Sequence, residues 1–165
     1  MESGITNPRV LISCAAVAAS AFAWQALADD TVATDTPEAT IASLQQALLA
    51  ARGTVEERYR ALEPTIVKTH NLRYFAEFAL RRHWATLTEP ERQRFVAAFQ
   101  RLSVTTYAAR FGSVARDAFR PIEAGATDAN GRVQVKTAIK REGQPDVTFE
   151  YLLQQDGANW RIINI

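Results

Sequence analysis

The residues that could carry out catalysis are few and widely spaced in this chain. His70 and His83 are the only histidines, and their separation fits no local metal-binding motif. No G-x-S-x-G, P-loop or dinucleotide-binding glycine pattern occurs. The acidic residues fall in turns and on predicted exposed faces, and none occupies an inward strand position, where a raised pKa would be expected. We therefore interpret both histidines as surface or helix-end residues and predict no metal, no cofactor and no catalytic group.

Aromatic side chains are, by contrast, abundant at positions predicted to point inward. They come from predicted helices and strands alike: Phe75, Phe78, Trp84, Phe95, Phe99, Tyr107, Phe149 and Tyr151. A packed core is the ordinary explanation for any one of them. The functional explanation is a pocket between helices and sheet that stays partly open for an apolar ligand. The sequence alone does not separate these two interpretations.

Basic residues lie close to these aromatics in the chain. Arg73 and Arg81 belong to the third predicted helix, and we interpret both as solvated side chains. Arg110 falls on the apolar side of the last predicted helix by the 3.6-residue period. It can extend its charged end into water or meet an anionic head group at the mouth of a pocket.

Four helices are predicted to position these residues. The longest runs from Thr88 to Gly112, opening with a capping box between Thr88 and Glu91. One of its faces carries Phe95, Phe99, Leu102 and Thr106. The other helices are predicted from Thr36 to about Arg52, from Val55 with a bend or break at Pro64, and from Leu72 to about Ala85.

The pattern after Gly112 changes to an alternation typical of strands, predicted at 118–123, 132–141, 146–155 and 160–165. For the apolar faces of the two central strands to coincide, the numbers of paired residues must sum to an even number. We predict the register that places Ile139 opposite Val147, because it also places Lys136 opposite Glu150 as a cross-strand charge pair. Helices followed by an antiparallel meander indicate a single α+β domain. We predict N-terminal helices packed on a curved antiparallel sheet, a cone-like arrangement like that of nuclear transport factor.

The N-terminal segment bears on where the protein is located, and the charge balance bears on which partners it can bind. An Ala-rich apolar run, Val10 to Trp24, precedes Ala26-Leu27-Ala28, which is typical of a signal-peptidase site. We predict a signal peptide at 1–28, with an uncleaved membrane anchor as the rival, then a disordered linker at 29–35 and the domain at 36–165. A formal net charge of +1 gives no electrostatic footprint for nucleic acid.

Several motifs along the domain resemble those of the MlaC family, also called toluene-tolerance auxiliary proteins. They are Trp84, Thr88-x-x-Glu91, Phe95-x-x-x-Phe99, Leu102, Thr106-Tyr107, Val135-x-Thr137, Val147-x-x-x-Tyr151 and Trp160-Arg161-Ile162. The last residues, 161–165, look closest to the branch associated with hopanoid synthesis. Asn164 and the pair Arg81-Arg82 depart from the family pattern. The family continues with a turn and a last helix, so we expect the chain to lack a C-terminal element.

The resemblance implies a periplasmic lipid carrier that binds phospholipid or a hopanoid-like lipid between helices and sheet. Its implied partners are an inner-membrane ABC transporter complex and an outer-membrane lipoprotein. The candidate lipid-binding residues are Phe75, Phe78, Trp84, Phe95, Phe99, Leu102, Tyr107, Arg110, Val135, Ile139, Phe149 and Tyr151.

Two other classes of function stay open at this point. An isomerase or dehydratase on a similar cone would need an inward acid or base, and Tyr107 and Tyr151 are the only inward polar tips in the pattern. A periplasmic interaction module would have a solid core. An internal apolar cavity without an inward acid or base would favour the carrier.

Overall fold

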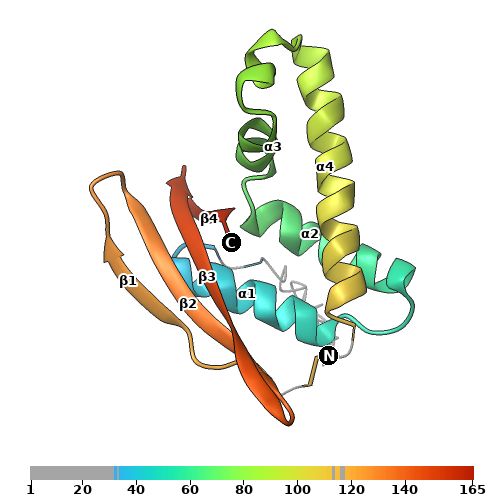
Figure 1. Ribbon diagram of the computed structural model, residues 1–165, viewed down its shortest axis with the longest axis vertical. Coiled ribbons are helices and arrows are strands. Elements are labelled where there is room, and N and C mark those ends of the chain that lie inside the picture. The colour runs from blue at the N-terminus through green and yellow to red at the C-terminus, as the bar shows by residue number, and fades with distance from the viewer. Residues whose placement is uncertain (1–31, 33, 113, 116–117) are drawn as a thin grey trace, which may run out of the picture. The chain divides into compact units, whose positions relative to one another are not determined.

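The computed structural model describes residues 32, 34–112, 114–115 and 118–165, which belong to one compact unit (Figure 1). The predicted signal peptide at 1–28 lies outside these residues. The elements follow the chain as α1 (Pro37–Ala50), α2 (Val55–Thr69), α3 (Leu72–Leu80), the 3₁₀ helix η1 (Arg81–Thr86), α4 (Glu89–Arg110), β1 (Glu123–Thr127), β2 (Arg132–Arg141), β3 (Gln144–Asp156) and β4 (Asn159–Asn164).

The predicted α+β architecture is confirmed. In the described part of the chain, four α-helices precede an antiparallel sheet of order β1-β2-β3-β4. The predicted register of β2 and β3 is also confirmed, with Ile139 opposite Val147 and Lys136 opposite Glu150. The last two side chains form an ion pair with 3.0 Å between Lys136 Nζ and Glu150 Oε1.

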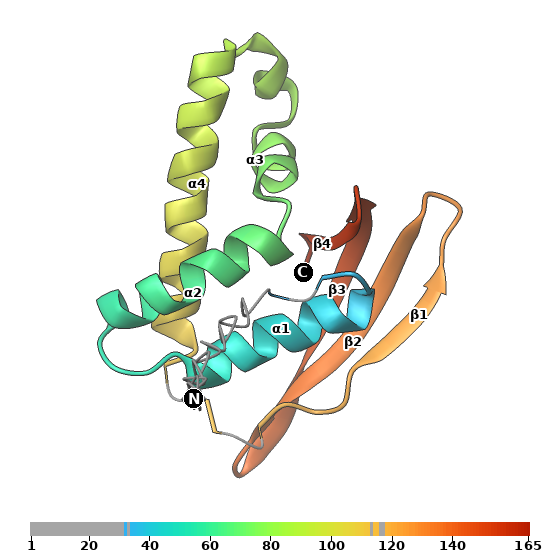
Figure 2. The same ribbon diagram turned by 180° about the vertical axis from the view of Figure 1, so that it is seen from behind.

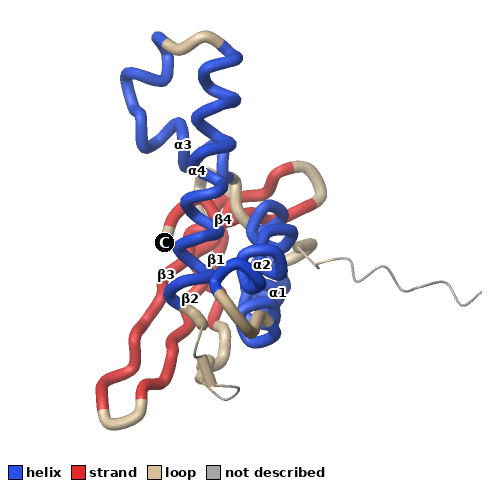
Figure 3. Tube along the Cα trace, turned by 90° about the vertical axis from the view of Figure 1, so that its right-hand side faces the viewer, coloured by secondary structure: helices blue, strands red, loops and turns tan. Residues whose placement is uncertain are grey.

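The helices cover one face of the sheet. α1 packs on β1, β2 and β4, while α2 contacts α1, α4 and β4 (Figures 1 and 2). The buried core between these layers consists of Ile41, Leu44, Leu48, Ala51, Leu62, Ile66, Val104, Ala108, Val133, Val135, Tyr151, Leu153 and Ile162. α3 and α4 pair as a hairpin that extends beyond the sheet (Figure 3). No helix among the described residues is long and apolar enough to cross a membrane.

The helix starts follow the sequence signals. Thr36 caps α1 by accepting a hydrogen bond from the amide of Ala39, and Thr54 and Glu57 form a capping box on α2. The predicted break at Pro64 is wrong, because α2 continues through it to Thr69. Proline removes one backbone hydrogen bond inside a helix. Burial of Leu62 and Ile66 on either side of Pro64 holds the helix together.

The third predicted helix is too long. α3 ends at Leu80 because Arg81 adopts a positive φ of 49°, which an α-helix does not tolerate, and the chain continues as η1. Trp84 is buried there, with the guanidinium groups of Arg73 and Arg92 each 5.4 Å from the ring centroid. Arg73 is exposed, as the sequence predicts, and also pairs with Glu89 at 3.1 Å.

The first predicted strand and the predicted linker have other boundaries in the structure than in the sequence prediction. The first strand begins at Glu123 instead of residue 118, and Phe119 makes only an isolated bridge to Ile139. Pro121 explains the gap, because it has no amide hydrogen to continue the ladder. The predicted linker is wrong at Thr34, which is buried and donates a hydrogen bond to Asn159 Oδ1 at 2.6 Å.

Candidate functional site

A continuous row of rings runs from the α3–α4 hairpin to β3 of the sheet. Neighbouring ring centroids are 5.4–6.4 Å apart along the whole row. From one end to the other the rings belong to Phe95, Phe99, Phe75, His70, Tyr107, Phe111, Phe149 and Tyr151. The row connects α3, α2, α4 and β3, which are far apart in the chain.

The spacing of residues along α4 builds half of this row. Phe95, Phe99, Ser103, Tyr107 and Phe111 follow one another at intervals of four. Such a ridge winds around a helix by about 40° per step, so it turns by about 160° over its length of about 24 Å. Its first rings therefore face α3, where Phe99 stacks on Phe75, and its last ring faces β3.

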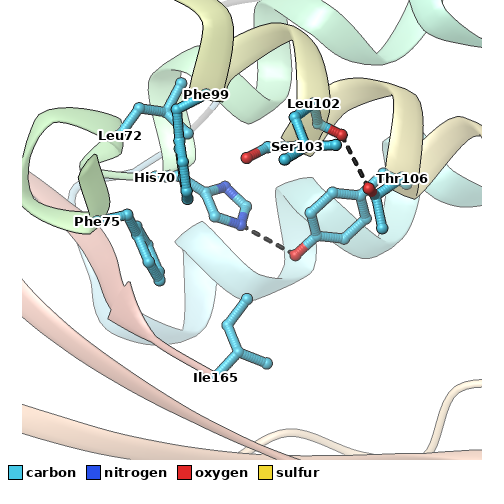
Figure 4. A pocket seen from close by; sticks show the side chains of 9 residues that line it. His70, Leu72, Phe75, Phe99, Leu102, Ser103, Thr106 and Ile165 are labelled. Carbon is cyan, nitrogen blue, oxygen red and sulfur yellow. Dashed lines mark hydrogen bonds between the residues drawn. The ribbon is translucent and has the colours of Figure 1, made fainter. Parts of the chain in front are cut away.

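A cavity of about 270 Å³ opens along the middle of the row (Figure 4). It is lined by His70, Leu72, Phe75, Phe99, Leu102, Ser103, Thr106, Tyr107 and Ile165. Among the described residues that line it, none is an acid, a lysine or an arginine. Its rim is apolar as well, because Leu102 and Ile165 are more than half exposed. This cavity can accept a hydrocarbon and offers no charge to a polar head group.

His70 holds the centre of the row in place. It caps the C-terminal end of α2 and forms a bridge to Ile162 of β4, and the amide of Asn71 donates to the Ile162 carbonyl at 2.9 Å. Asn71 then caps α3 through its side chain. Two helix ends are thus fixed to one strand, and the His70 ring is directed into the cavity (Figure 4).

The hydrogen bonds around His70 define its tautomer. The Thr69 hydroxyl donates its single proton to the Thr65 carbonyl at 2.8 Å, so it must accept from Nδ1 of His70 at 2.9 Å. Nε2 is then unprotonated and accepts from the Tyr107 hydroxyl at 2.9 Å. Burial lowers the pKa of His70 to about 4 and raises the pKa of Tyr107 above its usual range. Both side chains are neutral at physiological pH.

A second cavity, of about 410 Å³, lies at the sheet end of the row. Its apolar wall includes Phe111 and Phe149, and Phe111 stacks on Tyr107 of the first cavity with ring centroids 5.5 Å apart. Its lining also contains Arg110 and Ile139. The two cavities therefore adjoin the same row of rings and differ in charge.

A comparison with models of known protein families identifies the family of this chain. The family model described as MlaC protein matches residues 34–165. The chain belongs to the MlaC family. The family is periplasmic.

Solved structures contain the same fold. A phospholipid-binding protein from Ralstonia solanacearum, solved in complex with a phospholipid, is similar with a TM-score of 0.62. The two chains are 18% identical, and the similarity covers 76% of this chain and 74% of the other. No curated protein sequence matches this MlaC-family chain.

The structure distributes the twelve predicted site residues of this MlaC-family chain over several places. The first cavity contains Phe75, Phe99, Leu102 and Tyr107, and the second contains Arg110, Ile139 and Phe149. Val135 and Tyr151 lie in the packed core, although the Tyr151 ring stacks on Phe149. Phe95 continues the row beyond Phe99.

Phe78 and Trp84 lie away from both cavities, on the α3–α4 hairpin. Phe78 is 60% exposed, with the Arg81 guanidinium 5.2 Å from its ring centroid, so Arg81 stacks on an aromatic ring instead of being merely solvated. Trp84 is enclosed by arginines. The predicted inward direction is wrong for Phe78, which lies inside α3 but faces solvent. Trp84 is buried, but within the hairpin and away from the sheet, because the chain continues past Leu80 as η1.

Two members of the site were absent from the sequence prediction. The sequence predicts His70 as a surface or helix-end residue; it ends α2, but it is buried in the site. Phe111 is not among the predicted site residues, although its spacing of four from Tyr107 is visible in the sequence. No local signal identifies His70, because β4, which fixes it, lies about ninety residues further on.

Proposed function

We propose that this protein binds a phospholipid with its acyl chains along the row of rings between helices and sheet, and carries it through the periplasm. The observation that carries the proposal is the continuous apolar row from Phe95 to Phe149, which adjoins two open cavities. Membership of the MlaC family supports it. So does the fold shared with a protein from Ralstonia solanacearum solved with a phospholipid.

The dimensions of the row suit an acyl chain. The α4 ridge alone extends about 24 Å, whereas one leaflet of a bilayer hydrocarbon core spans about 15 Å. Each methylene removed from water contributes roughly 0.8 kcal/mol, so a long chain binds firmly without polar contacts. The volumes of the two cavities, about 270 and 410 Å³, are near the lower end of ordinary ligand pockets.

A role in transport between membranes extends this proposal. A carrier that holds its cargo by burial needs a membrane complex that opens the site for loading and release. We propose an inner-membrane ABC transporter complex and an outer-membrane lipoprotein for these steps, following the family resemblance of the sequence. The proposal includes a hopanoid-like lipid as an alternative cargo, because a rigid hydrocarbon also fits an uncharged cavity.

An enzymatic function is the alternative to lipid binding, because His70 is an inward imidazole of the kind that a cone-like enzyme would use. Both of its ring nitrogens are engaged, one by Thr69 and one by Tyr107. Its pKa of about 4 makes it a weak base at neutral pH. These properties suit a structural role, so binding without chemical conversion is the better account.

Native mass spectrometry of the chain purified from a bacterial periplasm tests the proposal. We expect one bound phospholipid per chain, recovered as intact lipid in an organic extract. Recovery of a hopanoid would change the cargo class, and recovery of cleaved lipids with one acyl chain would favour an enzyme. Protein that stays empty after incubation with phospholipid vesicles would exclude the carrier function.

A further inference from the structure

The cavity at the sheet end of the row has a cationic mouth. Arg110, Lys140 and Arg141 line it, and Glu142 is the one acidic residue among the described residues of its lining. These cations come from two elements, the last turn of α4 and the end of β2. Phe111 lies in the same lining, so positive charge stands directly beside the start of the apolar row.

None of these cations forms an ion pair with another described residue. The side chains of Arg110 and Lys140 form no ion pair or hydrogen bond with another described residue. Arg141 donates one hydrogen bond, from Nε to the Pro145 carbonyl at 3.1 Å, and the other two nitrogens of its guanidinium have no partner among the described residues. Arg120, by contrast, pairs with the carboxylate of Asp146 at 2.7 Å.

A helix-end effect explains only part of this cluster. Arg110 lies in the last turn of α4, where a cation is favourable near the helix C-terminus. Lys140 and Arg141 lie on a strand, where no such effect operates. Three cations without a carboxylate partner among the described residues, at the rim of a cavity with an aromatic wall, form an amphipathic site. Such a site suits a molecule with an anionic end and an apolar body.

The two ends of the row therefore differ in charge. The first cavity is lined by neutral side chains, with the His70–Tyr107 hydrogen bond as its central polar contact. The second has a surplus of positive charge at its mouth. A phosphate diester would lose its hydration at the first cavity without gaining a counter-charge, whereas arginine at the second can contact two phosphate oxygens at once.

We propose that Arg110, Lys140 and Arg141 bind the phosphate of the cargo lipid, so that its acyl chains run from Phe111 toward His70. This orientation rests on the proposed lipid-binding function. The cation cluster also selects among lipids: a head group of net negative charge, such as phosphatidylglycerol, is favoured over zwitterionic phosphatidylethanolamine, whose ammonium group faces the same cations.

The test is a competition for loading. The full chain is incubated with vesicles of equal parts phosphatidylglycerol and phosphatidylethanolamine, repurified, and extracted for lipid analysis. The test variant combines the three neutralising substitutions Arg110→Gln, Lys140→Gln and Arg141→Gln. The matched control neutralises Arg60, Arg94 and Arg101, also to Gln, three exposed cations on α2 and α4 that do not line either cavity. Both variants change the net charge equally, and circular dichroism checks their folding.

We expect the wild type and the control to be enriched in phosphatidylglycerol by about fivefold, from one uncompensated ion pair near the surface. The test variant should load the two lipids equally while keeping its total lipid. Equal head-group ratios in all three loaded proteins would overturn the orientation and leave the carrier function intact. No lipid in any protein would overturn both.

A free phosphate ion has the same chemistry as the head group, and a separate arm distinguishes the two. Inorganic phosphate is measured on the same proteins by equilibrium dialysis at constant ionic strength. If the test variant loses phosphate binding but loads the two lipids in the same ratio as the wild type, the three cations bind free phosphate and not the lipid head group. That result would overturn the proposal. A head-group ratio that changes with the mouth cations supports it.

Discussion

The Tyr107 hydroxyl donates a hydrogen bond to Nε2 of His70 across 2.9 Å and so joins the middle of α4 to the C-terminal end of α2. Burial keeps the imidazole neutral because it lowers the pKa of His70 to about 4, and with its one proton on Nδ1 the ring accepts from Tyr107 at Nε2. His70 is 3% exposed, and the pair lies at the centre of the row of rings. The structure therefore couples the protonation of one buried group to the shape of the site.

Acidification should destabilise the protein through His70. The pKa of His70 is about 4 in the fold, and its ordinary value of 6.5 applies to the unfolded chain. The unfolded state thus binds more protons between these two values, and stability falls as pH drops through the same window. The expected loss is about 3 kcal/mol in the free energy of unfolding. Below about pH 4 this group adds no further loss.

Urea unfolding of the wild type and of a His70→Gln variant, in steps from about pH 7 to about pH 4, measures this effect. The variant keeps the carboxylates that also titrate, so the difference between the two pH profiles isolates the imidazole. Parallel profiles would show that His70 titrates alike in folded and unfolded chains, contrary to the buried neutral form derived from the structure.

Removal of the Thr137 hydroxyl should also destabilise the fold. Thr137 is buried on β2, accepts from Gln45 Nε2 at 3.0 Å and donates to the Arg120 carbonyl at 2.9 Å. Thr137→Val leaves both partners unpaired, which costs about 1–3 kcal/mol. Thr148→Val, at an exposed position of β3, is the matched control and should change stability by less than about 0.5 kcal/mol. Equal urea midpoints for the two variants would contradict the prediction.

The pair of Lys136 and Glu150 should contribute little, despite its short distance. Both side chains are about half exposed, so water and salt screen the attraction. A double-mutant cycle with Lys136→Ala and Glu150→Ala should give a coupling free energy of about 0.2–1 kcal/mol that declines with added salt. A coupling well above this range, unchanged by salt, would mean that the pair is shielded from solvent.

The same pair shows which part of the fold the sequence determines most directly. Alternation along β2 and β3 limits the register to pairings that place both apolar faces on one side, and the opposite charges of Lys136 and Glu150 predict the observed one, with Ile139 opposite Val147. The capping boxes at Thr54 and Thr88 predicted the starts of α2 and α4 for a similar reason. In each case the information lies within a few residues or within one hairpin.

Features that depend on distant contacts were not predictable in this way. His70 becomes part of the site only because β4 pairs with its backbone. The end of α3 depends on the positive φ of Arg81, a conformation that arginine rarely adopts and no sequence rule anticipates. Helical periodicity alone places Phe78 and Trp84 in the predicted site, although Phe78 lies inside α3 and faces solvent and Trp84 lies beyond the end of that helix. Periodicity gives the face of a helix, but not the layer that covers it.

Filling the first cavity should displace the lipid without unfolding the protein. Ser103 lies on α4 between Phe99 and Tyr107 and lines the cavity (Figure 4). A tryptophan at this position would occupy space otherwise available to two or three methylenes, a loss of about 2 kcal/mol or roughly thirtyfold in affinity. The matched control is Thr105→Trp, at an exposed position two residues further along the same helix.

The amount of phospholipid extracted per chain decides this prediction. Ser103→Trp should retain little lipid, whereas Thr105→Trp should match the wild type, and circular dichroism should show folded protein in both cases. Equal lipid content in the two variants would place the acyl chains elsewhere, because a bulky ring cannot share the cavity with them. Loss of lipid from both would indicate that α4 tolerates no tryptophan, and Ser103→Leu paired with Thr105→Leu would then repeat the comparison with a smaller side chain.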